Sequence, residues 1–480
     1  MTACRKTKII CTLGPASWDE GILRALMLSG MDVARVNFSH AEYATLEPQL
    51  EMFKRLREEM DKPIALLADT KGPEVRLGMI AGGKVQLEDE KSIVLTTRQI
   101  DGSAERVSVS FEGLPGDVQK GTKILIDDGL IELCVETVSA TEIGCRIIHG
   151  GEISSRKGVN VPGVRLSMPY LSSRDRADLR FAVEHGFDFV AASFVYEAKN
   201  VREVRAELDR LGGRAIRIIA KIENAEGVAN IETILEASDG IMVARGDMGV
   251  EIAMEEIPVI QKLLITRSYS AGKQVITATQ MLESMVTHAR PTRAECTDVA
   301  NAIYDGTSAI MLSGETAAGK FPVEACQTMA RIAIRTEKDI DYRKRFHTRT
   351  PDIDMGNITN AISHATCSAG HDLSAAAIIT VTKSGDTAKM ISKFRPDCPI
   401  IGCSPDEQVV RQMNLSWGVT PLLLDEQMDS GELFEASVEK AKAAGCVTDG
   451  DLVVITAGVP LGVSGTTNMI HVNVVGERVR

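Results

Sequence analysis

The sequence has few aromatic residues, no long hydrophobic run and no excess of positive charge. Aromatic residues make up 4% of the 480 residues, and 25% are charged, which is typical of a globular chain rather than a disordered or fibrous one. No apolar stretch reaches the roughly 18 residues that a membrane helix needs, so we expect no membrane association. The formal net charge is −12, whereas a general nucleic-acid-binding protein carries an excess of basic residues.

The ten cysteines are scattered along the chain, and none of their spacings is that of a disulfide scaffold or a zinc site. We therefore expect free thiols in a reducing compartment. The first residues, MTACRKTKIICTLGP, hold only a short apolar run before Gly14, unlike a secretory signal peptide. These absences together predict a soluble, cytoplasmic protein.

Two hydrophobic patterns alternate along the chain. From residue 6 to 69, short apolar runs that indicate buried parallel strands are separated by amphipathic stretches, of which 18–29 and 43–60 are expected helices. Residues 71–166 instead contain short alternating runs rich in Val, Thr, Gly and Asp, which predict an all-β insertion. The strand–helix rhythm then resumes near residue 172 and continues to about residue 340.

The number of expected strands indicates a barrel. Three strands before the insertion and five after it make the eight of a (β/α)8 TIM barrel, with an open doubly wound sheet as the alternative. Residues 341–356 have the polar composition of a linker, and five more strands follow in an α/β unit. The predicted domains are a catalytic barrel (1–70 and 167–345), its insertion (71–166) and a C-terminal α/β domain (346–480).

Polar residues follow nearly every expected barrel strand. The carboxyl ends of the strands carry the functional groups of such a barrel. One polar residue at a strand end would indicate only a cap, but a whole series predicts an active site. In chain order the series is Arg35, Asn37, Ser39, Asp69, Thr70, Ser193, Lys221, Glu223, Arg245, Asp247, Thr279 and Ser313.

Lys221 and Glu223 are two residues apart, so in an extended strand their side chains face the same side. Asp247 follows the next expected strand. Two carboxylates on adjacent strands, without Cys or His, favour Mg²⁺ or Mn²⁺ over zinc, and the lysine suits a phosphoryl group. The alternative for this segment alone is an ordinary ion pair. Gly246 and Gly249 would let backbone N–H groups turn toward an anion.

A second oxygen-rich group comes from two other strand ends. The segment VARVNFSH and the residues after the next strand supply a cation, an amide, hydroxyls and a carboxylate. Hard oxygens of this kind suit a monovalent cation or a phosphate, and solvated caps are the alternative. The residues are Arg35, Asn37, Ser39, Asp69 and Thr70.

One segment matches part of the sequence pattern of a nucleotide-binding loop. GETAAGKF (314–321) follows an apolar strand and matches G-x-x-x-x-G-K. Phe321 stands where a serine or threonine should hold magnesium. We therefore predict that Lys320 is a solvated lysine near the start of a helix.

Together these segments resemble the pyruvate kinase family. The stretches that carry the resemblance are spread over nearly the whole chain and include TKIICTLGPAS, MDVARVNFSHA, ADTKGPEVR, AKIENAEGV, SDGIMVARGDMGVE and TATQMLESM. The resemblance implies a (β/α)8 barrel, an inserted β-barrel lid domain and a C-terminal α/β regulatory domain. It also implies a homotetramer that transfers the phosphoryl group of phosphoenolpyruvate to ADP in the final step of glycolysis, with Mg²⁺ (or Mn²⁺) and K⁺ as cofactors.

The resemblance further assigns roles by position. Arg35 would hold the phosphoryl group, Lys221 would stabilise it during transfer, and Thr279 would face the substrate. The resemblance does not assign the proton donor to the enolate; Thr279, acting through water, is our candidate. The other implied ligands are Glu223 and Asp247 for magnesium; Asn37, Ser39, Asp69 and Thr70 for potassium; the backbone N–H groups of Gly246 and Asp247 for the substrate carboxylate; and Asn37, His40, Arg76 and Lys157 for the nucleotide. Glu74 implies dependence on potassium, because family members with lysine there replace the ion.

The segment TVTKSGDTAKM (380–390) predicts a phosphate site in the C-terminal domain, and it resembles the family's sugar-phosphate effector loop. Hydroxyls, a lysine and exposed N–H groups between a strand and a helix can form a phosphate nest. Asp386 would repel a phosphate, and residues 457–468 contain no Lys or Arg. The segment is therefore either a binding site for a sugar-phosphate or nucleotide effector or an ordinary turn. The candidate effector residues are Thr382, Lys383, Ser384, Gly385 and Thr387.

Two other functions compete with the kinase. Metal-dependent carbon–carbon lyases on the same fold also stabilise a pyruvate enolate with a Glu/Asp metal site, and fold alone does not separate them. They need neither the all-β insertion nor Lys221. A non-catalytic sensor descended from the enzyme would be expected to have lost at least one of Lys221, Glu223, Asp247 and Thr279, and the sequence retains all four.

Overall fold

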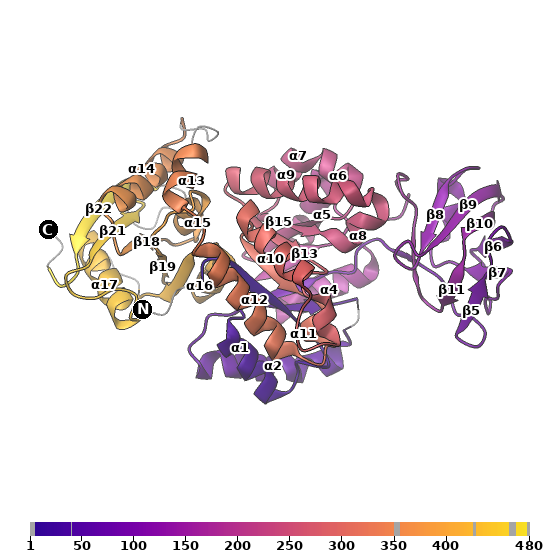
Figure 1. Cartoon of the computed structure of the whole chain (residues 1–480), viewed down its shortest axis with the longest axis horizontal. Helices are drawn as coiled ribbons and strands as arrows, with labels where there is room; N and C mark the ends of the chain where they lie inside the picture. Colours follow the sequence, from indigo (N-terminus) through magenta and orange to yellow (C-terminus); the bar gives the residue numbers. More distant parts are fainter. Residues whose placement is uncertain (1–4, 40, 350–355, 426–428, 460–466, 478–480) are drawn as a thin grey trace.

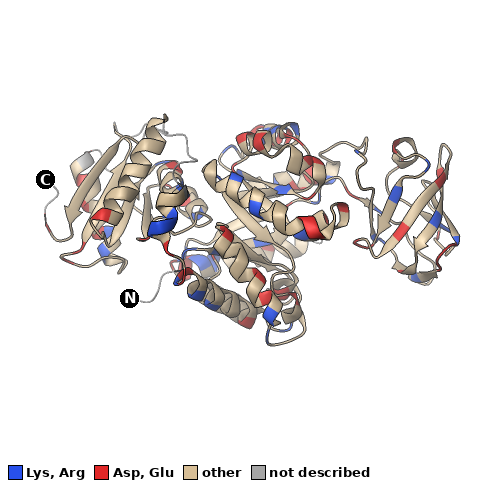
Figure 2. Cartoon of the chain, turned by 45° about the horizontal axis from the view of Figure 1, so that its top comes forward, with Lys and Arg blue, Asp and Glu red and all other residues tan. Residues whose placement is uncertain are grey.

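The computed structural model describes residues 5–39, 41–349, 356–425, 429–459 and 467–477. They form three bodies in a row, with the barrel between the inserted domain and the C-terminal domain (Figure 1). Basic and acidic residues are interspersed over all three bodies (Figure 2). Within these residues no helix has both the length and the apolar character needed to cross a membrane.

The central body is a closed barrel of eight strands, as the sequence predicts, and not an open sheet. Each strand pairs in parallel with its neighbours in the order β1-β17-β16-β15-β14-β13-β3-β2. Nearly all strand residues are buried because helices cover the barrel, which explains their continuous apolar runs. The strands are β1 (Lys8–Leu13), β2 (Val33–Asn37), β3 (Ala65–Asp69), β13 (Phe189–Ala192), β14 (Arg217–Ile222), β15 (Gly240–Ala244), β16 (Gln274–Ala278) and β17 (Ala309–Leu312).

Helices surround the barrel, and polar caps start several of them. Asp19 caps the first helix, and Ser172 and Thr292 form capping boxes. Lys320 is exposed just before α12, as predicted. The helices are α1 (Glu20–Ser29), α2 (Tyr43–Glu59), α4 (Ser173–Glu184), α5 (Ala198–Arg210), α6 (Ala225–Ala229), α7 (Ile231–Ala237), α8 (Arg245–Glu251), α9 (Ile257–Ser270), α10 (Arg293–Asp305), α11 (Gly314–Ala317) and α12 (Pro322–Glu337), with 3₁₀ turns at Met254–Glu256 and Glu283–Val286.

The inserted domain follows β3, so it leaves the barrel at the carboxyl ends of the strands. It is all-β apart from α3 (Leu114–Asp117), and a seven-stranded and a two-stranded sheet share one hydrophobic core. The strands are β4 (Val75–Arg76), β5 (Lys84–Leu87), β6 (Ser92–Thr96), β7 (Arg106–Ser108), β8 (Lys123–Ile126), β9 (Ile131–Val138), β10 (Glu142–His149), β11 (Gly151–Ser154) and β12 (Gly158–Asn160).

The C-terminal domain is a five-stranded sheet with helices on both sides, and all five expected strands form. Its strand order is β20-β19-β18-β21-β22, with only β22 antiparallel to its neighbour. The elements are α14 (Ile358–Asp372), β18 (Ala377–Val381), α15 (Asp386–Lys393), β19 (Ile400–Ser404), α16 (Glu407–Met413), β20 (Val419–Leu423), α17 (Ser430–Ala443), β21 (Leu452–Ala457) and β22 (Met469–Val474).

The expected linker 341–356 is wrong in its first half, which forms helix α13 (Tyr342–Arg349). Tyr342 and Phe346, one helical turn apart, are both buried. Tyr342 packs against Trp417 with ring centroids 5.3 Å apart, and Phe346 stacks on His364 at 4.9 Å. Contacts with the C-terminal domain therefore stabilise a segment that is too polar to predict as a helix by itself.

The C-terminal domain closes the amino-terminal end of the barrel. Leu415, which follows α16, belongs to the hydrophobic cluster inside the barrel. The side-chain amide of Asn414 donates to the carbonyls of Asp32 and Pro63 at 3.2 and 2.9 Å. The opposite end, where the strand-end residues lie, is thus the end at which ligands can enter.

Candidate active site

Asp69 connects two basic side chains, those of Arg35 and Lys221, at the mouth of the barrel. Its Oδ2 accepts from Arg35 Nε at 2.6 Å, and its Oδ1 accepts from Lys221 Nζ at 3.2 Å and from Ser193 Oγ at 3.3 Å. Although burial raises its pKa, Arg35 and Lys221 hold the pKa of Asp69 below its ordinary value. A charged carboxylate therefore fixes two cations at the ends of three strands.

Lys221 and Glu223 lie side by side, as their spacing predicts. Lys221 Nζ is 2.9 Å from Glu223 Oε1 and donates to Ser193 Oγ at 2.7 Å. Burial lowers the pKa of Lys221, but the carboxylates of Asp69, Glu223 and Asp247 outweigh burial and raise it. The lysine thus keeps its positive charge inside the site.

Glu223 has the character of a metal ligand. Its Oε2 accepts from the backbone N–H of Phe194 at 2.6 Å, while its buried Oε1 lies 2.9 Å from the ammonium group of Lys221. Burial raises the pKa of Glu223 to about 7, Lys221 opposes that shift, and Asp247 adds to it. A buried carboxylate near the negative charge of a second one, Asp247, is chemically suited to a divalent cation.

The second carboxylate, Asp247, lies in the first turn of α8. The described residues contain no cluster of three His, Cys, Asp or Glu side chains that could hold a metal. Magnesium commonly takes one or two carboxylates and completes its octahedron with water and phosphate oxygens, so Glu223 and Asp247 fit Mg²⁺ without a third protein ligand.

Thr279 has a backbone conformation that a β-branched residue seldom adopts. It follows β16 with φ 66°, and its hydroxyl accepts from Gly246 N–H at 2.8 Å and donates to the carbonyl of Ala278 at 2.6 Å. Arg245, held by Asp298 at 2.8 Å, donates to the carbonyl of Thr279 at 2.6 Å. Strain of this kind is typical of functional sites and persists only where neighbours enforce it.

The residues expected to bind potassium come from two paired strands. Asn37 lies opposite Asp69 in the β2–β3 register, Ser39 is two residues after Asn37, and Thr70 directly follows Asp69. The Asn37 side-chain carbonyl accepts from Ser39 N–H at 3.1 Å. Their hard oxygens fit a monovalent cation, although Arg35 and Lys221 already contact both oxygens of Asp69.

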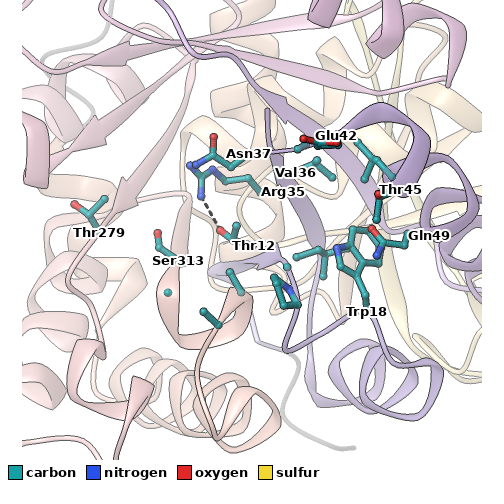
Figure 3. Close-up of a pocket in the computed structure, with 18 residues that line it drawn as sticks. Thr12, Trp18, Arg35, Val36, Asn37, Glu42, Thr45, Gln49, Thr279 and Ser313 are labelled. Carbon is teal, nitrogen blue, oxygen red and sulfur yellow. Dashed lines mark hydrogen bonds between the residues drawn. The ribbon is translucent and has the colours of Figure 1, made fainter. Parts of the chain in front are cut away.

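A cavity of about 710 Å³ opens beside these residues. In Figure 3, Arg35 stands between Thr279 and Ser313 on one side and the ring of Trp18 with Gln49 on the other. One wall is therefore polar and close to the cations, while the other offers an aromatic surface. A ligand with a charged end and a flat, less polar end suits this shape.

A second cavity of about 410 Å³ lies between the barrel and the inserted domain. Arg76 and Lys157 line it together with Asp247. Arg76 is bound to Glu74, with Nη2 at 3.0 Å from Oε2, and Lys157 pairs with Asp127 at 2.7 Å. The expected nucleotide residues from the insertion thus line the same cavity as Asp247, the expected metal ligand of the barrel. His40 lies outside the described residues.

The candidate effector loop joins β18 to α15. Gly385, at φ 82°, donates its N–H to Thr382 Oγ1 at 3.0 Å, and Ser384 Oγ donates to Asp386 at 2.9 Å. Thr387 Oγ1 lies 2.9 Å from Thr467 Oγ1. Lys389 and Arg217 offset the charge of Asp386, because they keep its pKa low although burial raises it.

Sequence reasoning identified Lys221, Glu223, Asp247 and Arg35, and the structure brings them together at one end of the barrel. It gave no role to Ser193, which bonds both Lys221 and Asp69. Its position at a strand end was the only signal.

The chain matches two family profiles, "Pyruvate kinase, barrel domain" over residues 4–326 and "Pyruvate kinase, alpha/beta domain" over residues 360–473. It is 47% identical to the pyruvate kinase of Clostridium acetobutylicum, over 98% of this chain and 100% of the relative. Its identity to that of Geobacillus stearothermophilus is 47%, over 98% and 81%. A crystal structure of a pyruvate kinase from Cryptosporidium parvum superimposes with a TM-score of 0.92 at 37% identity, covering 98% and 96% of the two chains.

Proposed function

Because this chain belongs to the pyruvate kinase family, we propose that the strand-end residues of its barrel carry out the family's reaction. The enzyme transfers the phosphoryl group of phosphoenolpyruvate to ADP, takes up a proton, and releases pyruvate and ATP. The observation that most supports this site is the group in which Asp69 and Glu223 hold two cations, Arg35 and Lys221, at the ends of the barrel strands, with Arg35 lining the adjacent cavity.

Arg35 and Lys221 neutralise the phosphoryl group during transfer. Phosphoryl transfer needs in-line positioning and charge neutralisation rather than covalent help from the protein. Asp69 keeps both cations at the mouth of the barrel before the substrate binds, and Lys221 needs little reorganisation during the reaction.

Glu223 and Asp247 would hold Mg²⁺, and Asn37, Ser39, Asp69 and Thr70 would hold K⁺. Bound magnesium supplies charge neutralisation to the phosphoryl and enolate oxygens. For potassium to bind, Arg35 would turn from Asp69 toward the phosphoryl group, which would free a carboxylate oxygen.

The substrate would lie between these residues and Thr279. The N–H groups of Gly246 and Asp247 would bind its carboxylate, which requires Gly246 to exchange its bond to the Thr279 hydroxyl for the substrate. Thr279 would then be free to relay a proton, through water, to the methylene carbon of the enolate.

ADP would lie across the mouth, near Asn37 and His40 in the barrel and Arg76 and Lys157 in the insertion. Movement of the insertion toward the barrel would exclude water and bring the two basic residues onto the phosphates.

At the level of the whole protein we propose a cytoplasmic homotetramer with a phosphorylated effector at residues 382–387. Exposed apolar side chains in the 3₁₀ turn before α9 (Met254) and on α9 itself (Val259 and Leu263) are suited to contacts between subunits.

A coupled assay of the purified chain tests the function. With phosphoenolpyruvate, ADP, Mg²⁺ and K⁺ it should form one pyruvate and one ATP for each phosphoenolpyruvate consumed. Carbon–carbon cleavage of a pyruvate-yielding acid without ADP would instead support a lyase, and absence of any turnover would support a sensor.

A further inference from the structure

One side of the large cavity beside Arg35 is formed by the start of α2 and the segment before it. Figure 3 shows Glu42, Thr45 and Gln49 on the side of this cavity that also carries Trp18. Glu42 is the N-cap residue of α2, and its side chain makes no capping hydrogen bond. Because the helix has no side-chain cap of its own, the position of this wall depends on contacts with another element.

Helix α4 supplies these contacts through Arg174. Its Nη2 donates to the carbonyl of Ala41 at 2.9 Å, and Ala41 lines the cavity directly before Glu42. The guanidinium group of Arg174 also lies 4.6 Å from the ring centre of Tyr43, the first residue of α2. The Tyr43 ring stacks on Phe181, with ring centroids 4.7 Å apart. One arginine thus contacts both the segment before α2 and the first residue of the helix.

Asp178, one turn further along α4, holds this arginine. Its Oδ1 accepts from the Tyr43 hydroxyl and lies 3.0 Å from Arg174 Nε. The Asp178 side chain is fully buried, and burial raises its pKa to about 6, although Tyr43 and Arg174 oppose that shift. The described residues that line the cavity do not include Asp178, so this carboxylate would act on a ligand only through its two partners.

We propose that Asp178 and Arg174 are positioning residues for the nucleotide, because they fix the segment against which the base of ADP lies. This inference rests on the proposed kinase function. ADP has a flat base and a charged phosphate end, which suit the aromatic and the polar wall of the cavity. A segment that is already ordered loses less conformational entropy when the nucleotide binds. The two residues should therefore affect the binding of ADP and not that of phosphoenolpyruvate, which would lie among the strand-end residues.

Arg174→Lys tests the proposal most directly, because lysine keeps a positive charge beside Asp178 but lacks the second nitrogen that binds Ala41. The Arg174 side chain is 45% exposed, so the variant should fold. Calorimetric titration of the full chain with ADP and Mg²⁺ should show binding at least about fivefold weaker than in the parent. The KM for ADP should rise by a similar factor, while kcat and the KM for phosphoenolpyruvate should stay within about twofold of the parent.

Asp178→Asn should weaken ADP binding in the same way, because a neutral amide keeps the shape of the carboxylate but holds the arginine less strongly. If Asp178→Asn folds poorly, Tyr43→Phe removes only the hydroxyl that donates to Asp178 and should act in the same direction. Arg205→Lys is the matched control. Arg205 also pairs with an aspartate at i+4, Asp209 at 3.7 Å, and donates to a backbone carbonyl, that of Ile216 at 2.7 Å, but it does not line this cavity. Its ADP binding should equal that of the parent.

The proposal is overturned if either Arg174→Lys or Asp178→Asn binds ADP as tightly as the parent. It is also overturned if these variants raise the two KM values equally, as a general loss of structure would. A parent that binds ADP but forms no pyruvate would contradict the proposed kinase function and not the positioning role, which the binding measurement tests by itself. A parent that does not bind ADP would overturn both.

Discussion

At the scale of single residues, Asp69 explains why the strand-end side chains act together. It contacts Arg35, Lys221 and Ser193 at once, and it is almost fully buried. A buried carboxylate with two cationic partners stabilises their positions more than a surface pair would. The cations are therefore ready for an incoming phosphoryl group.

The first prediction concerns Glu74 and states that turnover depends on potassium. With a glutamate here, the positive charge that a lysine at this position would supply is missing. Replacing K⁺ by tetramethylammonium should lower kcat by about 10²-fold, the typical effect of removing one preorganised electrostatic contact. Glu74→Lys should reduce that dependence. Steady-state rates in the two salts check this, and equal rates for the parent would contradict it.

That the strand-end residues lie together could be predicted from sequence, because a whole series of polar residues at barrel strand ends indicates a functional site. The hydrogen bonds that these residues form could not be predicted. Thr279, at φ 66°, is bonded by Gly246 and Arg245, and Arg245 is in turn bonded by Asp298 from another helix. Such contacts depend on packing between distant segments, which periodicity does not encode.

At the scale of elements, strands were predicted better than connections. The barrel strands are buried on both faces, so their apolar runs are unambiguous. Helix α13 was missed because its only strong apolar anchors, Tyr342 and Phe346, gain their stability from Trp417 and His364. Tertiary contacts override local propensity there.

The second prediction concerns the loop between β18 and α15 and its response to phosphorylated effectors. If it binds a phosphorylated effector, a sugar monophosphate or bisphosphate should lower the half-saturating concentration of phosphoenolpyruvate. Thr382→Ala combined with Ser384→Ala should erase the response, because it removes two hydroxyls and the bond that shapes the loop. Unactivated turnover should stay the same. Initial rates across sugar phosphates and nucleoside monophosphates measure this, and a flat response in the parent would make the loop an ordinary turn.

At the scale of the whole molecule, the floor of the barrel depends on the C-terminal domain, and this gives the third prediction. Arg411 Nε donates to Asp188 Oδ1 at 2.9 Å, and the Asp188 side chain is fully buried. Arg411→Ala should lower the free energy of unfolding by about 3 kcal/mol, because it leaves a buried carboxylate without its cation. Denaturant unfolding measures the loss.

Arg335→Ala is the control, since Arg335 pairs with Asp339 at 3.9 Å on the surface. It should cost less than about 1 kcal/mol. Equal losses in the two variants would mean that the contact between the domains contributes no more than a surface pair.

Phosphoryl transfer by the residues at the mouth of the barrel is tested most directly by the rate of pyruvate formation in Lys221→Met, with Lys320→Met as the control. Loss of the buried charge should slow the transfer by about 10³-fold or more. Metal-assisted proton exchange on pyruvate should survive better, because Lys221 has no role as an acid. Lys320→Met alters the exposed lysine of the segment 314–321, and its rate of pyruvate formation should equal that of the parent. A loss of less than about tenfold in Lys221→Met, or an equal loss in both variants, would contradict the proposed site.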